Sequence, residues 1–341
     1  MSRRALMLAL TLVSAGALAV EPAGPVGPRP ALIAAKAVQA RLMDIAQAGS
    51  QLIAVGEEGV ILVSADGQNW VQSPSPVNVM LTRVRFSDAL HGWALGYDTT
   101  ILQTADGGKS WQLRHYDPQG RGLYDILFTD AHNGLAVGGF GRVYATHDGG
   151  QTWADAGSPL SKPGVHLNVL LKLQDGSLFV AGERGFMARS KDNGTNWQAL
   201  NSPYAGSFFG ARALGEKGLL VYGMRGNVFV TADIGRCATL DLARWDPDTR
   251  QSVADAGRIA SLGWKRIDNP SHESLFGDLP LKDHTLLMLG VNGTALKLNT
   301  ATATMHTVKT PAAETLTHAV LHGGRVIAVG RRGVQDLGVS P

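Results

Sequence analysis

The stretch LQTADGGKSW, residues 102–111, carries a Thr, an Asp, a Gly and a Trp at fixed spacing. Alternating residues on either side predict two strands of a hairpin, 100–104 and 110–114. Glycine permits positive φ in the turn, and the carboxylate of Asp106 can accept hydrogen bonds from turn amides. Trp111 then falls on the outer strand, where its ring can cover the sheet edge. The stretch is therefore interpreted as a structural turn.

The same spacing, known as the Asp-box or BNR repeat, recurs along the chain. The repeated positions are Thr104, Asp106, Gly108 and Trp111; Thr146, Asp148, Gly150 and Trp153; Ser190, Asp192, Gly194 and Trp197; and, shortened, Ser64, Asp66, Gly67 and Trp70. A fifth unit keeps Thr231, Asp233 and Gly235, but 236–263 separates this turn from Trp264 and is interpreted as an insertion. The sixth unit has lost the motif.

Repeated glycines give the period of the whole chain. They are Gly56, Gly96, Gly138, Gly182, Gly223, Gly290 and Gly330, separated by 40, 42, 44, 41, 67 and 40 residues. Within the second unit, strands are expected at 81–86, 92–95, 100–104 and 110–114. A period near forty with four short strands predicts an all-β, seven-bladed β-propeller with four-stranded antiparallel blades.

The last unit offers only three strands, near 317–321, 325–329 and 334–337. The apolar segment 31–38 lies before the first inner strand. We expect it to supply the missing strand and close the ring, which would remove exposed edges. Its alanines leave open a short surface helix instead.

The N-terminus predicts export. Arg3 and Arg4 precede an apolar run that ends in small residues, so 1–19 is interpreted as a signal peptide, through the general or the twin-arginine route, and 20–30 as a Pro/Gly-rich linker. We therefore expect a periplasmic or secreted protein that does not span the membrane once the signal peptide is cleaved. Cys237 is the only cysteine, which excludes an intramolecular disulfide and favours an inert thiol.

Composition excludes several function classes. Without Arg3 and Arg4, 29 basic residues face 28 acidic ones, and the charge of +1 argues against a nucleic-acid partner. No tyrosine follows Tyr222, so the final third of the chain lacks the nucleophile that sialidases use. Each Asp-Gly turn presents one carboxylate, too few for calcium, and His318 and His322 are interpreted as solvated. We expect no catalytic residue, metal or cofactor.

The stretch FSDALHGWALGYDTTILQTADGGKSW, residues 86–111, resembles the photosystem II assembly factor Ycf48/Hcf136 family, and the likeness covers the mature chain. The resemblance implies a seven-bladed propeller that acts as a non-enzymatic assembly factor. The resemblance also implies that exported relatives serve envelope complexes or transporters. It further implies that an arginine-rich patch binds the client protein. The repeats are specific for the fold and weak for the partner.

Turns between second and third strands should lie on the face opposite the Asp-boxes. This face and the long connections beside it are rich in arginine and aromatic residues, the usual anchors of interfaces. The predicted partner-binding residues are Arg83, Arg114, Arg121, Arg142, Arg184, Arg225, Arg331, Arg332 and Tyr97. The sequence thus predicts a scaffold that binds a membrane protein complex or a transporter. The alternative is a carbohydrate or small-ligand site at Phe208, Phe209 and Tyr124 in the central channel. A further alternative is that the predicted partner-binding residues are ordinary turn residues exposed to solvent.

Overall fold

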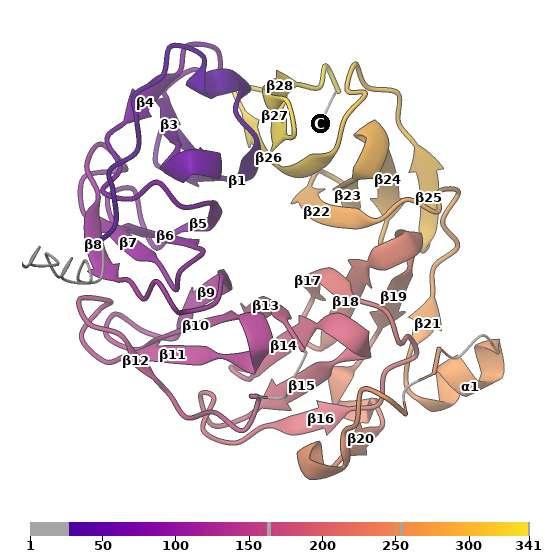
Figure 1. The fold of residues 1–341 in the computed structure, drawn as a ribbon. Coiled ribbons are helices and arrows are strands. Elements are labelled where there is room, and N and C mark those ends of the chain that lie inside the picture. Colours follow the sequence, from indigo (N-terminus) through magenta and orange to yellow (C-terminus); the bar gives the residue numbers. More distant parts are fainter. Residues whose placement is uncertain (1–26, 162–164, 250, 253–254, 340–341) are drawn as a thin grey trace, which may run out of the picture.

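The computed structural model describes residues 27–161, 165–249, 251–252 and 255–339. Seven antiparallel sheets stand radially around a central channel, with the last sheet beside the first (Figure 1). The seven-bladed propeller is confirmed. The predicted signal peptide, 1–19, and most of the predicted linker lie outside the described residues.

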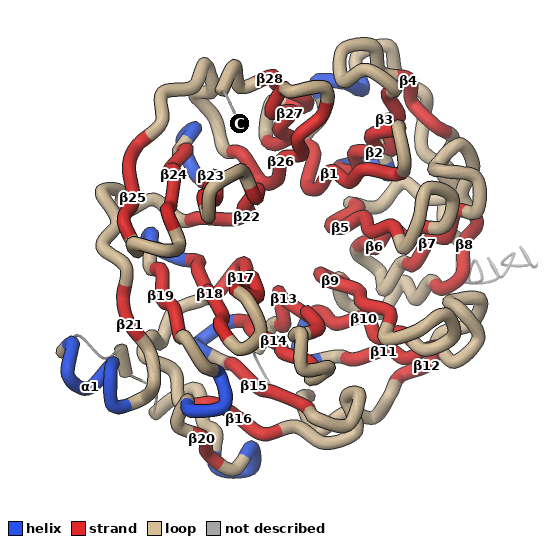
Figure 2. Tube along the Cα trace, turned by 180° about the vertical axis from the view of Figure 1, so that it is seen from behind, coloured by secondary structure: helices blue, strands red, loops and turns tan. Residues whose placement is uncertain are grey.

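Each blade runs from an inner strand at the channel to an outer strand at the perimeter (Figure 2). Blades 1 to 3 consist of β1 (Leu42–Ala48), β2 (Gln51–Gly56), β3 (Ile61–Ser64) and β4 (Val71–Ser73); β5 (Leu81–Phe86), β6 (Gly92–Gly96), β7 (Ile101–Thr104) and β8 (Gln112–His115); and β9 (Leu123–Phe128), β10 (Gly134–Gly138), β11 (Val143–Thr146) and β12 (Ala154–Asp155).

Blades 4 to 6 consist of β13 (Leu167–Lys172), β14 (Leu178–Gly182), β15 (Met187–Ser190) and β16 (Gln198–Leu200); β17 (Phe208–Leu214), β18 (Gly218–Gly223), β19 (Val228–Thr231) and β21 (Lys265–Arg266); and β22 (Leu275–Pro280), β23 (Thr285–Gly290), β24 (Ala295–Asn299) and β25 (Thr304–Thr307). Blade 7 has three strands, β26 (Leu316–His322), β27 (Arg325–Gly330) and β28 (Gly333–Asp336). Each sheet is antiparallel, as the alternating patterns predict.

The prediction of a closing strand at 31–38 is wrong. In the described part of the chain this segment contains a single 3₁₀ turn, η1 (Ala37–Gln39), which contacts β28. The residues before η1 hydrogen-bond to blade 1 instead: the amide N of Ala31 donates to the Ser75 carbonyl at 3.0 Å. The segment therefore leaves blade 7 three-stranded, and alanine-rich sequence favours the turn over a strand.

The insertion reaches back to the preceding blade. Its strand β20 (Thr239–Leu240) pairs with β16 and becomes a fifth strand of blade 4. Trp245 is buried and meets the Phe186 ring edge to face, with centroids 4.8 Å apart. Helix α1 (Ala256–Ser261) projects from the perimeter beside β21 (Figure 1). Cys237 is buried within the same region, and burial raises the pKa of its thiol.

The core is divided into seven apolar layers, one between each pair of neighbouring blades, including blades 7 and 1. Each layer contains aliphatic residues from neighbouring strands, and several layers also contain Trp, Phe or Tyr rings. A blade cannot bury both of its faces by itself, so adjacent blades stabilise one another.

Asp-box turns hold these layers together. Thr146 Oγ1 donates to Asp148 Oδ1 at 2.8 Å and accepts the Gly150 amide at 2.9 Å. The indole N–H of Trp153 donates to the Gly150 carbonyl at 3.1 Å, and the ring is buried just before β12. Hydrogen bonds from Thr152, then from Thr146, lower the pKa of Asp148.

Each of these turns also packs on the second strand of the preceding blade. A Cβ on Gly150 would come within 2.4 Å of Trp93 on β6, and one on Gly108 within 2.8 Å of Ile53 on β2. The structural role predicted for the Asp-box fits these contacts.

Candidate functional site

Every inner strand carries a β-bulge at the same place. In each blade the register between the first two strands shifts by one residue near the start of the inner strand. The residues left unpaired are Met43, Thr82, Tyr124, Asn168, Phe209, Phe276 and Thr317. A bulge re-aims the side chain at the inserted position. All seven line one cavity.

This cavity, the channel mouth, has a volume of about 480 Å³ and opens among the turns between second and third strands. Its apolar wall includes the Phe209 and Phe276 rings, whose centroids are 5.1 Å apart. Tyr97 and Tyr124 meet edge to face at 6.5 Å on another part of the wall. Burial, with a contribution from Tyr97, raises the pKa of Tyr124 to about 12, so its phenol is neutral.

The polar bulge residues join neighbouring blades rather than face a ligand. Asn168 Nδ2 donates to the Phe208 carbonyl of blade 5 at 2.8 Å, and Thr317 Oγ1 donates to the Leu42 carbonyl of blade 1 at 3.3 Å. Thr82 makes the corresponding bond to the Leu123 carbonyl of blade 3. The apolar members of the ring therefore remain as the ligand-facing ones.

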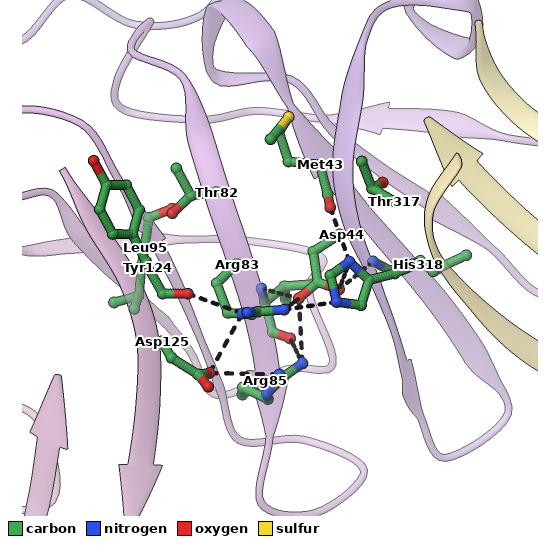
Figure 3. A network of polar contacts seen from close by, with 12 residues as sticks. Met43, Asp44, Thr82, Arg83, Arg85, Leu95, Tyr124, Asp125, Thr317 and His318 are labelled. Atoms are coloured by element: carbon green, nitrogen blue, oxygen red, sulfur yellow. Dashed lines mark hydrogen bonds and ion pairs between the residues drawn. The ribbon is translucent and has the colours of Figure 1, made fainter. Parts of the chain in front are cut away.

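A buried ionic network forms the floor of the channel mouth (Figure 3). The Nε atom of Arg83 lies 3.3 Å from Asp125 Oδ1, and its Nη1 atom lies 3.9 Å from Asp44 Oδ2. Arg85 bridges the same two carboxylates at 3.2 and 3.4 Å. Two arginines thus balance two aspartates, and the network adds no net charge to the cavity. Charges buried this deeply need such pairing.

His318 joins this network from blade 7. Its Nε2 atom lies 2.8 Å from Nη1 of Arg83, and its Nδ1 atom lies 3.2 Å from the Met43 carbonyl. A guanidinium only donates, so Nε2 must accept and Nδ1 must carry the proton. Burial lowers the pKa of His318 below its ordinary value, although the charge of Asp44 opposes this.

Asp44 remains ionised below this histidine. Burial alone would raise the pKa of its carboxyl, but His318, Arg85 and Arg83 together lower it. Asp44 also accepts the Val84 amide from blade 2 at 2.9 Å, so one carboxylate connects two blades.

The rim of the channel mouth consists of turns with residues in the left-handed region. Among them are Phe140 at φ 57°, Arg184 at φ 52° and Arg225 at φ 56°. Residues other than glycine rarely adopt this left-handed conformation, which here forms part of a tight turn. Arg121 lies over the Phe140 ring, 4.8 Å from its centroid, and this ring contacts His166 at 5.1 Å. The rim between blades 2 and 4 is therefore aromatic.

The structure brings only some of the predicted partner-binding residues together. Arg83, Arg331 and Tyr97 line the channel mouth. Arg83 is buried and forms the ion pairs described above, so the prediction that it lies on a partner-binding surface is wrong. Arg331 and Arg332 are exposed and share one carboxylate, Glu314, at 3.8 and 3.7 Å.

The remaining arginines lie farther out. Arg142 pairs with Asp155, and Arg184 pairs with Asp248 of the insertion at 2.7 Å. Arg225 borders a second cavity, between its turn and α1. Arg114 is placed away from this face: its Nε donates to Gln103 at 2.7 Å, in a pocket with Asp106.

Other residues of the site escaped sequence reasoning. Arg41 on the rim and Met43, Met80 and Phe276 on the wall were not predicted. A signal existed, because each bulge residue lies 13 or 14 positions before the repeated glycine of its unit. Phe208, proposed for the channel, is fully buried, since the bulge directs only Phe209 inward. His318, interpreted as solvated, is instead part of the floor.

In the described ranges no group of three or more His, Cys, Asp or Glu side chains is arranged to hold a metal ion. None of the helices in those ranges is both long and apolar enough to span a membrane.

Fold and site together define a β-propeller with Asp-box turns and a ligand-sized channel mouth. Residues 63–273 match the family described as photosynthesis system II assembly factor YCF48, and the chain belongs to this family. It is 30% identical over 217 residues to photosystem II assembly protein Ycf48 of Thermosynechococcus vestitus, with 62% of this chain and 58% of that protein covered.

A second relative, the photosystem II assembly lipoprotein Ycf48 of Prochlorococcus marinus, is 35% identical over 184 residues, which cover 53% of this chain and 52% of the relative. The match thus spans little more than half the length of these two proteins. A solved structure of YCF48 bound to D1 peptide has a TM-score of 0.63 at 18% identity and covers 92% of this chain and 95% of that one. At this identity the structure supports the fold alone.

Proposed function

We propose that this protein is an exported, non-catalytic assembly factor that binds a segment of a membrane protein complex or transporter. The binding face is the one that carries the channel mouth and its surrounding arginines. Family membership supports the assembly role, because the relatives are named as photosystem II assembly proteins and one solved structure is described as YCF48 bound to D1 peptide.

The observation that carries this proposal is the cationic rim. Arg41 and Arg331 border the channel mouth, and no carboxylate lines that cavity in the described part of the chain. Glu314 is shared between Arg331 and Arg332, so a net positive charge remains there. Arginine beside aromatic walls is typical of interface anchors. The Asp-box face, by contrast, is held by its own internal hydrogen bonds.

Charge reversal on the two faces tests the proposal. Arg184, Arg225 and Arg331 are replaced together by Glu, and capture of membrane proteins from the envelope fraction of the source cells is measured. The matched control replaces three exposed cations of the Asp-box face, Lys109, Lys191 and Arg236, by Glu.

Reversal on the channel-mouth face should abolish capture, whereas the control should retain it, and both proteins should unfold near the wild-type temperature. Equal capture by the two variants would reject the Arg-containing face as the binding surface.

A further inference from the structure

The side chains at the seven bulged positions of the channel mouth differ in what they contact. Three are polar, and each donates to a carbonyl of the next blade. Phe209 and Phe276 are half-buried and face the cavity side by side. Apolar rings left partly exposed in a concave site are a characteristic of ligand pockets, and a cavity of about 480 Å³ is of the size such pockets have.

Charge is distributed unevenly around the same cavity. The excess positive charge comes from blades 7 and 1, where Arg41 borders the rim beside Arg331, which shares the Glu314 carboxylate with Arg332. The Phe209 and Phe276 pair comes from blades 5 and 6. The floor is electrically balanced, because Arg83 and Arg85 are neutralised by Asp44 and Asp125. The cavity is therefore cationic on one side and apolar on the other.

We infer that the channel mouth is an anchor site for a peptide segment in which a large apolar side chain lies close to a carboxylate. The apolar side chain packs against Phe209 and Phe276, and the carboxylate faces Arg41 and Arg331. This inference rests on the proposed function and names the chemistry of the client segment. A charged group that enters alone would leave the aromatic wall uncovered, and an apolar group alone would leave the excess positive charge of the rim unbalanced.

The inference is tested with labelled hexapeptides that have blocked termini. Each contains one Phe and one Asp, separated by zero, one or two residues, in a background of Gly and Ser. Fluorescence anisotropy with the full protein should detect binding of at least one spacing. In that peptide, Phe to Ala or Asp to Asn should weaken affinity by at least about fivefold, and added salt should weaken binding of the Asp peptide more than that of the Asn peptide.

Substitutions in the protein provide the second arm. Phe209→Ala with Phe276→Ala should weaken binding by at least about fivefold, because two anchors of the wall are lost. Phe140→Ala is the matched control, since Phe140 is exposed on the same face but does not line the cavity. Arg41→Gln with Arg331→Gln should remove the difference between the Asp and Asn peptides.

Failure of the inference is distinguishable from failure of the proposed function. If none of the peptides binds, if the double Phe variant binds as the wild type does, or if soluble oligosaccharides bind in place of peptides, the anchor site is rejected. Client capture that resists the double Phe substitution but is lost on arginine reversal rejects the anchor alone. If the double Phe variant fails to fold, the Phe and Asp substitutions in the peptide still test the anchor site, because they use the wild-type protein.

Discussion

The contact between blades 2 and 3 and the contact between blades 7 and 1 serve the same purpose with different chemistry. Between blades 2 and 3, Trp93 stacks on Phe128 with centroids 4.0 Å apart, and Trp153 meets Phe128 edge to face. Between blades 7 and 1, the layer contains aliphatic residues such as Leu52 and Ile327, and hydrogen bonds of Thr317 and His318 add to this packing. The contact between blades 2 and 3 thus uses aromatic packing, whereas the contact that closes the ring combines aliphatic packing with hydrogen bonds and a titratable group.

The two ring-closing elements explain this difference. Blade 7 lacks an outer strand in the described residues, so no Asp-box tryptophan of its own reinforces it. The first Asp-box, which packs against Ile327 of β27, is the shortened one. Its Trp70 is only half-buried, and the indole N–H has no hydrogen-bond partner among the described residues, unlike that of Trp153.

Trp153→Ala should have the largest effect. The ring is 7% exposed and both packs and hydrogen-bonds, so we expect a loss of about 3 to 5 kcal/mol in the free energy of unfolding. Trp70→Ala is the matched substitution at the ring-closing contact, and a smaller loss is expected there. Equilibrium denaturation measures both, and equal losses would contradict the difference between the two contacts.

Gly333→Ala should come next, because it acts on the ring-closing contact through the backbone. The residue has φ 77°, and a Cβ would come within 1.9 Å of the carbonyl oxygen of Val38 in η1. The left-handed conformation alone costs about 1 to 2 kcal/mol for alanine, and the clash adds to this. Gly338→Ala, at φ 59° with no atom of the described chain within 4 Å of the new Cβ, is the control for conformational strain alone. Thermal unfolding should show a larger loss at 333, and identical losses would mean that η1 does not restrain this turn.

The smallest expected effect is a pH dependence of the ring-closing contact. Burial lowers the pKa of His318 below its ordinary 6.5, so the unfolded chain takes up the proton first. The free energy of unfolding should fall as the pH is lowered from about 6.5 through the native pKa, because protonated Nε2 would face the Arg83 guanidinium. Asp44 favours the charged ring, and Arg85 opposes it.

His318→Asn should flatten the pH profile in that range. Thr317→Val breaks a hydrogen bond of the same contact without removing a titratable group, so it should shift the whole profile and preserve its shape. Denaturant midpoints between pH 5 and 8 measure both variants. An unchanged slope in His318→Asn would exclude this histidine as the source.

Much of the blade structure was predictable because it depends on local alternation and turn chemistry. The strand expected at 81–86 coincides with β5, and the strands of blade 7 agree to within one residue. The conformation of segment 31–38 was not predictable in this way, because it depends on contacts with β28 and blade 1 rather than on the segment's own sequence pattern.

The candidate site was harder to predict for two physical reasons. A bulge reverses the alternation at one residue, so sequence could not tell that Phe209 lines the cavity while Phe208 is buried. Arg83 was placed on a surface because its partner His318 is 235 positions away, and only ring closure brings them together. The repeated glycines did fix which turns share a face.

The seven bulges also separate two tasks that most strands combine. Neighbouring residues of each inner strand maintain the hydrogen-bonded ladder and the layers between blades, whereas the extra residue is free of the ladder. At the four bulges whose side chains do not donate to the next blade, Met43, Tyr124, Phe209 and Phe276, substitutions can accumulate one blade at a time without breaking a bond between blades. A family built in this way can acquire new clients by changing a few side chains around a fixed frame.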